Sequence, residues 1–144
     1  MALADPLRRT VPAAVAQCRR AGIRVVPITG RPAGWCDLIA RQWPVDGVVG
    51  ENGAFYFRYD EAAKKMIRVY AQSPEVRRAN TEKLRKIADQ VLADFPGTAI
   101  ASDQAYREID VAIDFCEDVP PLPLATAQAI AEAPERRRHD AKDA

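Results

Sequence analysis

Histidine, paired cysteines and long apolar runs are scarce in this sequence, and each scarcity excludes a class of function. The 144 residues include one histidine, His139, and three cysteines that form no Cys-x-x-Cys pair. A zinc site needs four converging nitrogen or sulfur ligands at short spacing, so this pattern argues against one. A Ser-His or Cys-His catalytic pair is also disfavoured, because His139 lies in a charged terminal stretch. We interpret Cys18, Cys36 and Cys116 as buried free thiols.

An excess of charge of one sign is missing as well. The 21 Lys and Arg residues nearly balance 20 Asp and Glu residues, so the net charge of +1 gives no general attraction to nucleic acid or anionic lipid. No apolar run approaches the roughly 20 residues that a membrane helix needs. The first ten residues include an acid and an early proline, unlike a signal peptide. The sequence therefore predicts a soluble, cytoplasmic protein without nucleic-acid or membrane partners.

The first third of the chain alternates helix-like and strand-like segments. Apolar residues at helical spacing predict a helix that Gly22 closes. The continuous apolar run over 24–28 predicts a strand buried on both faces. A helix over 32–42 and a short strand over 48–49 follow. This order is typical of a parallel α/β layer.

The pattern changes after Gly53, where alternating apolar residues predict antiparallel strands. The elements expected from here on are a hairpin over 54–59 and 66–70, a helix over 74–94, strands over 98–101 and 108–115, and a helix ending at about 133. We therefore predict an α/β protein: a partial Rossmann-like core of parallel strands and helices over 1–53, and an α+β module with antiparallel strands over 54–133. Residues 134–144 are predicted to form a charged, disordered tail.

A candidate anion site follows the first predicted strand. In open α/β sheets, ligands bind beyond the carboxyl ends of the strands, beside helix N-termini. The Thr29 hydroxyl and the N–H groups of Gly30 and Arg31 are predicted to converge there, with the Arg31 charge and the positive end of the helix that starts near Pro32. A simple turn after the strand is the alternative interpretation.

A second polar loop, Glu51-Asn52-Gly53, follows the next predicted strand. An Asn-Gly pair is usually a tight turn. Because the two strands are predicted to run parallel, both loops are expected at the same edge of the sheet.

The motifs "PITGRP" and "GENGA" together resemble the haloacid dehalogenase (HAD) superfamily of hydrolases. The resemblance is closest to the branch with a large α/β cap, which includes sucrose-phosphatase-like and mannosyl-phosphoglycerate-phosphatase-like enzymes. It implies that Thr29 binds the phosphoryl group, and that Arg31, Asn52 and Gly53 border the active-site mouth. It also implies that the module from Ala54 onward is a cap over the site. The implied activity is Mg²⁺-dependent hydrolysis of a small phosphate monoester, such as a sugar phosphate.

In this family, loops of the cap contact the leaving group and set substrate specificity. By that resemblance, the segment "SDQAYRE" supplies substrate-specificity candidates, namely Asp103, Gln104 and Arg107.

The resemblance also shows what this chain lacks. The family's nucleophile and general acid form an Asp-x-Asp motif ahead of the first loop. Here the only acid before Thr29 is Asp5, and Leu7 stands where the second acid belongs. The family's later Lys and its Mg²⁺-binding Gly-Asp loop have no counterpart, so we assign no catalytic or metal-ligating residue and expect no activity from this chain alone.

Other carboxylates do not replace the missing ones. Asp110 and Asp114 are four residues apart on a predicted strand and share a face, which we interpret as a solvated face. Glu51 lies close to the presumed site but is a single carboxylate without a partner.

Three interpretations stay open. The chain is a piece of a HAD-type phosphatase from a shortened or misread gene, a stand-alone module that binds phosphate esters without hydrolysing them, or an unrelated α/β interaction protein. Without the family's nucleophile-bearing strand, the strand over 24–28 has an unpaired edge, and such edges tend to pair with another chain. We therefore expect a poorly stable first part or a homodimer.

Overall fold

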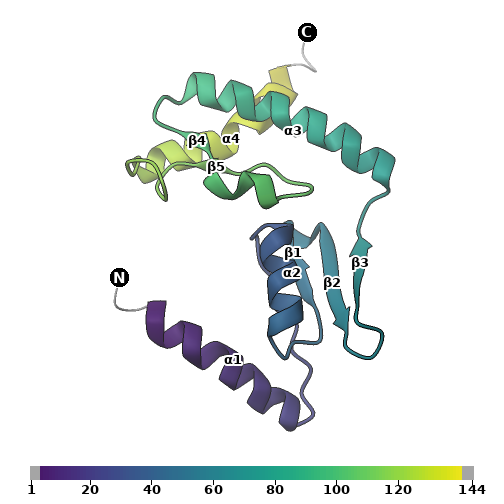
Figure 1. Ribbon diagram of the computed structural model, residues 1–144. Helices are drawn as coiled ribbons and strands as arrows, with labels where there is room; N and C mark the ends of the chain where they lie inside the picture. Colours follow the sequence, from purple (N-terminus) through teal and green to yellow (C-terminus); the bar gives the residue numbers. More distant parts are fainter. Residues whose placement is uncertain (1–3, 141–144) are drawn as a thin grey trace. The chain divides into compact units, whose positions relative to one another are not determined.

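The computed structural model describes the backbone of residues 4–140 and the side chains of residues 10–133. It confirms a mixed α/β fold with antiparallel strands (Figure 1). Two compact units are present, each described separately below. The first contains the chain up to Ser73 together with Tyr106–Glu108, and the second contains the remainder.

Helix α1 (Ala4–Arg20) ends as its sequence predicts. Gly22 adopts a φ of 75°, in the left-handed region that favours glycine. The Ile23 N–H donates to the Cys18 carbonyl at 2.9 Å, which satisfies a carbonyl that the helix end leaves open. The predicted C-cap at Gly22 is therefore confirmed.

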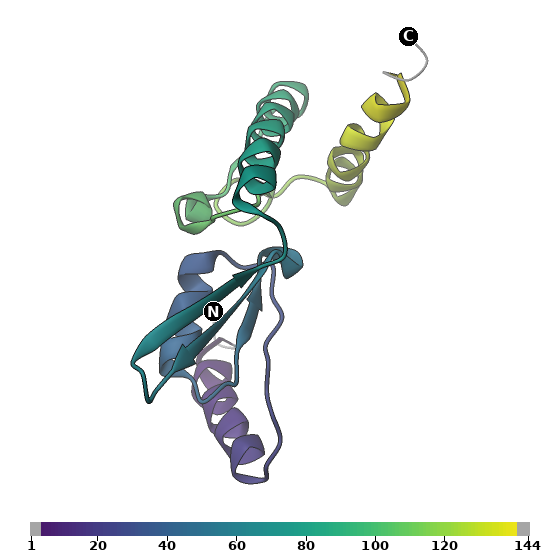
Figure 2. The same ribbon diagram turned by 90° about the vertical axis from the view of Figure 1, so that its right-hand side faces the viewer.

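A three-stranded antiparallel sheet forms the centre of the first unit. Its strands β1 (Val48–Gly50), β2 (Phe55–Asp60) and β3 (Lys65–Tyr70) lie in the order β1-β2-β3. The predicted hairpin over 54–59 and 66–70 is thus confirmed. Helix α2 (Ala33–Gln42) lies along one face of this sheet (Figure 2).

The core of the first unit lies between α2 and the sheet. Its largest fully buried side chains are Phe55, Phe57, Val48, Pro32 and Cys36. The rings of Phe55 and Phe57 stack with their centroids 4.2 Å apart. The alternation of apolar residues along β2 therefore correctly indicated which face is buried.

The strand predicted over 24–28 does not form. Only Ile28 pairs with the sheet, through an isolated parallel bridge to Val49. Pro27 accepts a hydrogen bond from the Val49 N–H at 2.9 Å but has no N–H of its own to continue a ladder. Val25 instead exchanges hydrogen bonds with Asp46, whose carboxylate accepts from the Val25 N–H at 2.8 Å.

The prediction that this run is buried on both faces is also wrong. The side chain of Ile28 is 77% exposed and that of Val26 is 47% exposed. The run has a neighbouring strand on one side only among the described residues, so nothing in this part of the chain covers its other edge.

The two units divide the chain at a different place from the change of pattern at Gly53. The hairpin β2–β3 extends the sheet that begins with β1, and β2 packs against α2. The hairpin therefore belongs to the first unit, and the division falls between Ser73 and Pro74.

The second unit contains two long helices and a short strand pair. Its elements are α3 (Pro74–Asp94), β4 (Ala99–Ile100), most of the 3₁₀ helix η2 (Ser102–Tyr106), β5 (Ile113–Asp114) and α4 (Leu124–Asp140). β4 and β5 pair antiparallel. Helix α4 runs past the expected end at about 133. The side chains of the predicted tail, 134–144, lie outside the described residues.

The strand predicted over 108–115 shrinks to the two residues of β5. In the residues just before β5, the Gln104 side chain bonds the backbone where a partner strand would otherwise do so. The Gln104 amide donates to the Asp110 carbonyl and accepts from the Ala112 N–H, both at 3.0 Å. This local pairing satisfies the backbone without a ladder.

Asp114 is buried rather than part of a solvated strand face. Its carboxylate accepts backbone N–H groups of Cys116, Glu117 and Asp118 at 2.7–2.9 Å. These hydrogen bonds, that from Glu117 most of all, hold the pKa of the Asp114 carboxyl below its usual value. The carboxylate therefore fixes the turn that follows β5.

We expect Asp114→Asn to destabilise the second unit at neutral pH and to flatten its acid sensitivity. Because the folded-state pKa is lowered, this group stabilises the fold above the ordinary carboxyl pKa of about 4 and ceases to do so as the pH falls through the folded value. Urea unfolding followed by far-UV circular dichroism between pH 7 and pH 2 measures this. The exposed Asp89 on α3 provides the control Asp89→Asn, and equal curves for both variants would contradict the expectation.

Candidate functional site

The two polar loops that the sequence singled out lie side by side. The parallel bridge between Ile28 and Val49 aligns the segments that lead into them. The Asn52 N–H then donates to the Thr29 carbonyl at 3.3 Å, and the Glu51 N–H donates to the Arg31 carbonyl at 3.2 Å. The expectation that both loops share one edge is therefore confirmed.

Gly30 lies close to the Asn52 side chain of the second loop. A Cβ built on Gly30 would lie 2.9 Å from Oδ1 of Asn52, closer than such contacts allow. The second loop (η1, Glu51–Gly53) is a left-handed turn, with φ values of 43°, 57° and 98° at Glu51, Asn52 and Gly53. Asn and Gly adopt this conformation readily, whereas Glu rarely does.

The Glu51 side chain explains why that conformation is held. It is only 2% exposed, and its Oε1 accepts the N–H groups of Ala33 and Glu108, both at 2.9 Å. Ala33 is the first residue of α2, so the carboxylate caps the positive end of this helix. The sequence had marked Glu51 only as a lone carboxylate near the site. No local pattern identifies a cap that lies 18 residues away.

This cap changes the anion site that the sequence predicted. The helix N-terminus near Pro32 was expected to face a bound anion, but Glu51 already occupies its Ala33 N–H. The Arg31 N–H was also expected to donate to the anion, but it donates to Oγ1 of Thr29 at 3.1 Å. Both groups are therefore engaged within the protein.

Other donors of the first loop are available. Thr29 is partly exposed, and Gly30 and Arg31 are exposed. Within the side chains and backbone that the structure describes, neither the Thr29 hydroxyl hydrogen nor the Gly30 N–H meets an acceptor. These two groups are the anion donors that the loop leaves open, and Arg31 adds a positive charge to the loop.

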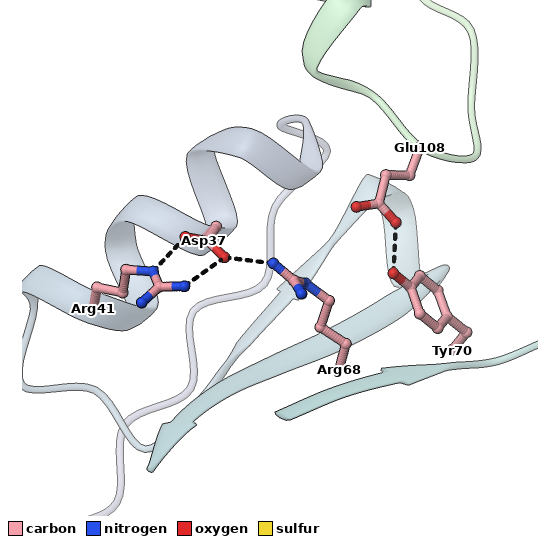
Figure 3. Close-up of polar contacts among 5 residues, drawn as sticks. All are labelled: Asp37, Arg41, Arg68, Tyr70 and Glu108. Atoms are coloured by element: carbon pink, nitrogen blue, oxygen red, sulfur yellow. Dashed lines mark hydrogen bonds and ion pairs between the residues drawn. The ribbon is translucent and has the colours of Figure 1, made fainter. Parts of the chain in front are cut away.

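The segment Tyr106–Glu108 packs onto these loops as part of the first unit. Arg107 donates from Nη1 to the Gly30 carbonyl at 3.0 Å. Glu108 accepts from the Tyr70 hydroxyl at 2.5 Å (Figure 3), in addition to its N–H bond to Glu51. Of the three specificity candidates, Arg107 therefore reaches the predicted phosphate loop.

The other two specificity candidates belong to the second unit. The Gln104 side-chain amide is engaged with backbone groups, as described above, so it has a structural role. Asp103 is partly exposed within η2, and its proposed contact with substrate stays a prediction.

An ionic cluster that the sequence did not predict joins α2 to β3. Asp37 accepts from Nε of Arg41 at 2.6 Å and from Nη2 of Arg68 at 2.9 Å (Figure 3). The hydrogen bond from Arg41, followed by the other Arg41 and Arg68 interactions, lowers the pKa of the Asp37 carboxyl against the effect of partial burial. The Arg68 guanidinium also lies 5.3 Å from the centre of the Phe57 ring. The cluster lies at the surface and holds the helix to the sheet.

The cysteines are free but not all buried. Cys36 is fully buried, Cys18 is partly exposed and Cys116 is exposed, so the expectation of buried thiols is wrong for Cys116. Burial, and secondarily the negative charge of Glu51, raises the pKa of the Cys36 thiol to about 11. Cys36 is therefore a protonated packing residue rather than a nucleophile.

The residues at the loops do not fit Mg²⁺. This ion takes six oxygen ligands, usually including carboxylates. Glu51 points its Oε1 at two N–H donors, and no group of three or more His, Cys, Asp or Glu side chains among the described residues is arranged to hold a metal. Asp5 and Leu7, at the place of the missing Asp-x-Asp motif, have side chains outside the described residues.

Comparisons with known proteins give distant matches. No family model matches the chain. It is 26% identical over 147 residues to the sodium/potassium-transporting ATPase subunit alpha-B of Artemia franciscana, covering 97% of this chain and 14% of that protein. It is 24% identical over 148 residues to the potassium-transporting ATPase alpha chain 2 of Cavia porcellus, with the same coverages of 97% and 14%. The chain thus spans about 14% of the length of the curated relatives it matches.

These matches correct the family assignment made from the motifs. P-type ATPase alpha chains belong to the HAD-like superfamily but not to the branch with sucrose-phosphatase-like caps. The assignment to that branch is therefore wrong, and the similarity found is a distant one to two ATPase alpha chains. No helix in the described part of the chain is both long and apolar enough to cross a membrane.

Proposed function

We propose that this chain is a non-catalytic module that binds the phosphate group of a small phosphorylated metabolite at the loop Thr29–Arg31. The observation that carries the proposal is the pairing of this loop with Glu51–Gly53, which holds the Thr29 hydroxyl, the Gly30 N–H and the Arg31 side chain on one exposed loop. The distant similarity to HAD-like proteins supports a phosphate ligand.

Binding is favoured over hydrolysis because the Glu51 carboxylate beside the loop already accepts two backbone hydrogen bonds. A phosphatase needs a nucleophile that is free to attack phosphorus. Glu51 is buried and accepts two N–H groups, and moving it would uncap α2. Hydrolysis of a phosphate monoester with Mg²⁺ would need nucleophile and metal ligands that these loops do not offer.

We expect inorganic phosphate to bind, and Thr29→Ala and Arg31→Ala each to weaken binding about tenfold. Arg31→Ala removes the charged side chain, and Thr29→Ala removes the hydroxyl donor together with the acceptor of the Arg31 N–H. Neither side chain belongs to the buried core. Isothermal titration calorimetry measures the affinity, and Arg58→Ala, at an exposed arginine on β2, is the matched control.

Two results would contradict this proposal. Equal phosphate affinity in the Thr29, Arg31 and Arg58 variants would place any binding elsewhere. Steady, Mg²⁺-dependent release of phosphate from p-nitrophenyl phosphate, lost in Thr29→Ala, would show that the module is catalytic.

A second proposed property is homodimerisation through the open edge at 24–28. The Val25, Pro27 and Thr29 backbone groups bond toward Asp46 and Val49, so alternate residues present their backbone to the other side. Val26 and Ile28 are also highly exposed there. A second copy of this chain would satisfy that edge by pairing its own 24–28 segment.

We expect Ile28→Lys to convert a concentration-dependent dimer into a monomer, because charged residues block edge pairing. Size-exclusion chromatography with light scattering measures this across a dilution series. Val69→Lys is the matched control, since Val69 is 49% exposed on β3 at the other edge of the same sheet. A monomer in the unsubstituted protein, or equal effects of both lysines, would exclude this dimer.

A further inference from the structure

An apolar hollow of about 260 Å³ lies on the first unit and has no part in the proposed phosphate contacts. It is lined by Gly34, Trp35, Leu38 and Tyr106. Trp35 is 49% exposed, Leu38 is 45% exposed and Tyr106 is 62% exposed. Three large apolar side chains thus remain open to solvent at one hollow, although a well-packed surface would cover them.

The hollow is built by the first turns of α2 and by the segment Tyr106–Glu108. Trp35 and Leu38 are three residues apart in α2 and therefore share one helical face. Gly34 lets the tyrosine approach, because a Cβ at this position would lie 3.1 Å from the Cβ of Tyr106. Arg107 and Glu108 anchor this segment to Gly30 and Glu51.

The same contacts place the hollow beside the phosphate loop. Gly34 follows Arg31 by three residues, at the start of the helix that the loop leads into. Tyr106, which also lines the hollow, directly precedes Arg107, which donates to the Gly30 carbonyl. A ligand held by its phosphate at Thr29–Arg31 would therefore have its organic part close to Trp35 and Tyr106.

We infer that this hollow binds the planar aromatic ring of a phosphate monoester, so that the ligand is an aryl or heteroaryl phosphate. This inference rests on the proposed phosphate site and names its ligand class. Two aromatic side chains and a leucine suit stacking and apolar contact with a ring. A sugar would need several hydrogen-bonding partners, and among the described residues that line the hollow the Tyr106 hydroxyl is the only polar side-chain group. The volume of about 260 Å³ suits a single ring system.

The test compares phenyl phosphate with methyl phosphate on the full chain. The protein carries Trp43→Phe, which leaves Trp35 as its only tryptophan. We expect phenyl phosphate to bind about tenfold more tightly than methyl phosphate by calorimetry, as ring stacking adds roughly one factor of ten. Phenyl phosphate alone is expected to change Trp35 fluorescence.

Variants separate this inference from the proposed function. Leu38→Ala and Tyr106→Ala should each reduce the preference for phenyl phosphate and leave methyl phosphate affinity unchanged. Thr29→Ala should weaken both ligands by the same factor. Equal affinities for the two esters in the parent protein would overturn the aromatic site while leaving the phosphate site intact, and binding of neither ester would overturn both.

Discussion

Glu51→Ala is expected to lower the free energy of unfolding of the first unit by about 3 to 5 kcal/mol. The substitution removes the acceptor of two N–H groups, those of Ala33 and Glu108, and leaves a cavity where a fully enclosed carboxylate stood. It also uncaps α2 and frees Tyr106–Glu108 from one of its anchors. The left-handed backbone at position 51 would then lack the contacts that hold it.

Tryptophan fluorescence during urea unfolding measures this loss of stability in the first unit. Both tryptophans, Trp35 and Trp43, belong to the first unit, so the signal reports its unfolding. Glu51→Gln keeps a side-chain acceptor of the same shape, so it should lower the free energy of unfolding by about half as much as Glu51→Ala. Glu61→Ala, in the exposed turn after β2, should change stability by less than about 0.5 kcal/mol. A loss at Glu51 no larger than that at Glu61 would show that the cap does not stabilise the unit.

Gly50→Ala is expected to destabilise the first unit by about 3 kcal/mol, at the upper end of the effect of overpacking a core. A Cβ at this position would lie 2.3 Å from Cζ of Phe55 and 2.6 Å from Sγ of Cys36. Both neighbours are fully buried, so neither can move aside cheaply. The strain is purely steric, because the Gly50 φ of −120° suits any residue.

Gly22→Ala separates this effect from the general cost of replacing glycine. Gly22 has a φ of 75° but no atom within 4 Å of a built Cβ. Its replacement should therefore cost only about 1 kcal/mol of backbone strain. Urea unfolding by tryptophan fluorescence compares the two. Similar losses in both variants would mean that the core around Gly50 adapts.

The candidate site was predictable in part, because its two loops follow runs with clear patterns. Thr29-Gly30-Arg31 and Asn52-Gly53 were expected at one edge, and the bridge between Ile28 and Val49 brings them together. The use of the Arg31 N–H and the helix N-terminus was not foreseen, since both are taken by contacts that the sequence does not display. The assignment to the sucrose-phosphatase-like branch failed because two short motifs, around Thr29 and Asn52, are too little sequence to identify a branch. The distant matches are to ATPase alpha chains instead.

The sequence by itself determined the local elements of this protein. Helical spacing, Gly22 as a cap and the alternation of Phe55 and Phe57 predicted α1, α2 and the hairpin, because these features depend on neighbours along the chain. The apolar run at 24–28 was misread for the opposite reason. Whether an extended run becomes a buried strand depends on partners on both sides, and Pro27 cannot donate to one.

Only the tertiary structure decided which polar groups form hydrogen bonds within the protein and which face solvent. Glu51 caps a helix from 18 residues away, and Arg107 reaches Gly30 across 77 residues. The Asp114 carboxylate accepts backbone N–H groups of the turn that follows β5, instead of lying on a solvated strand face. Hydrogen bonds and charges act over a few ångströms in space, so their partners follow from the folded backbone and not from sequence spacing.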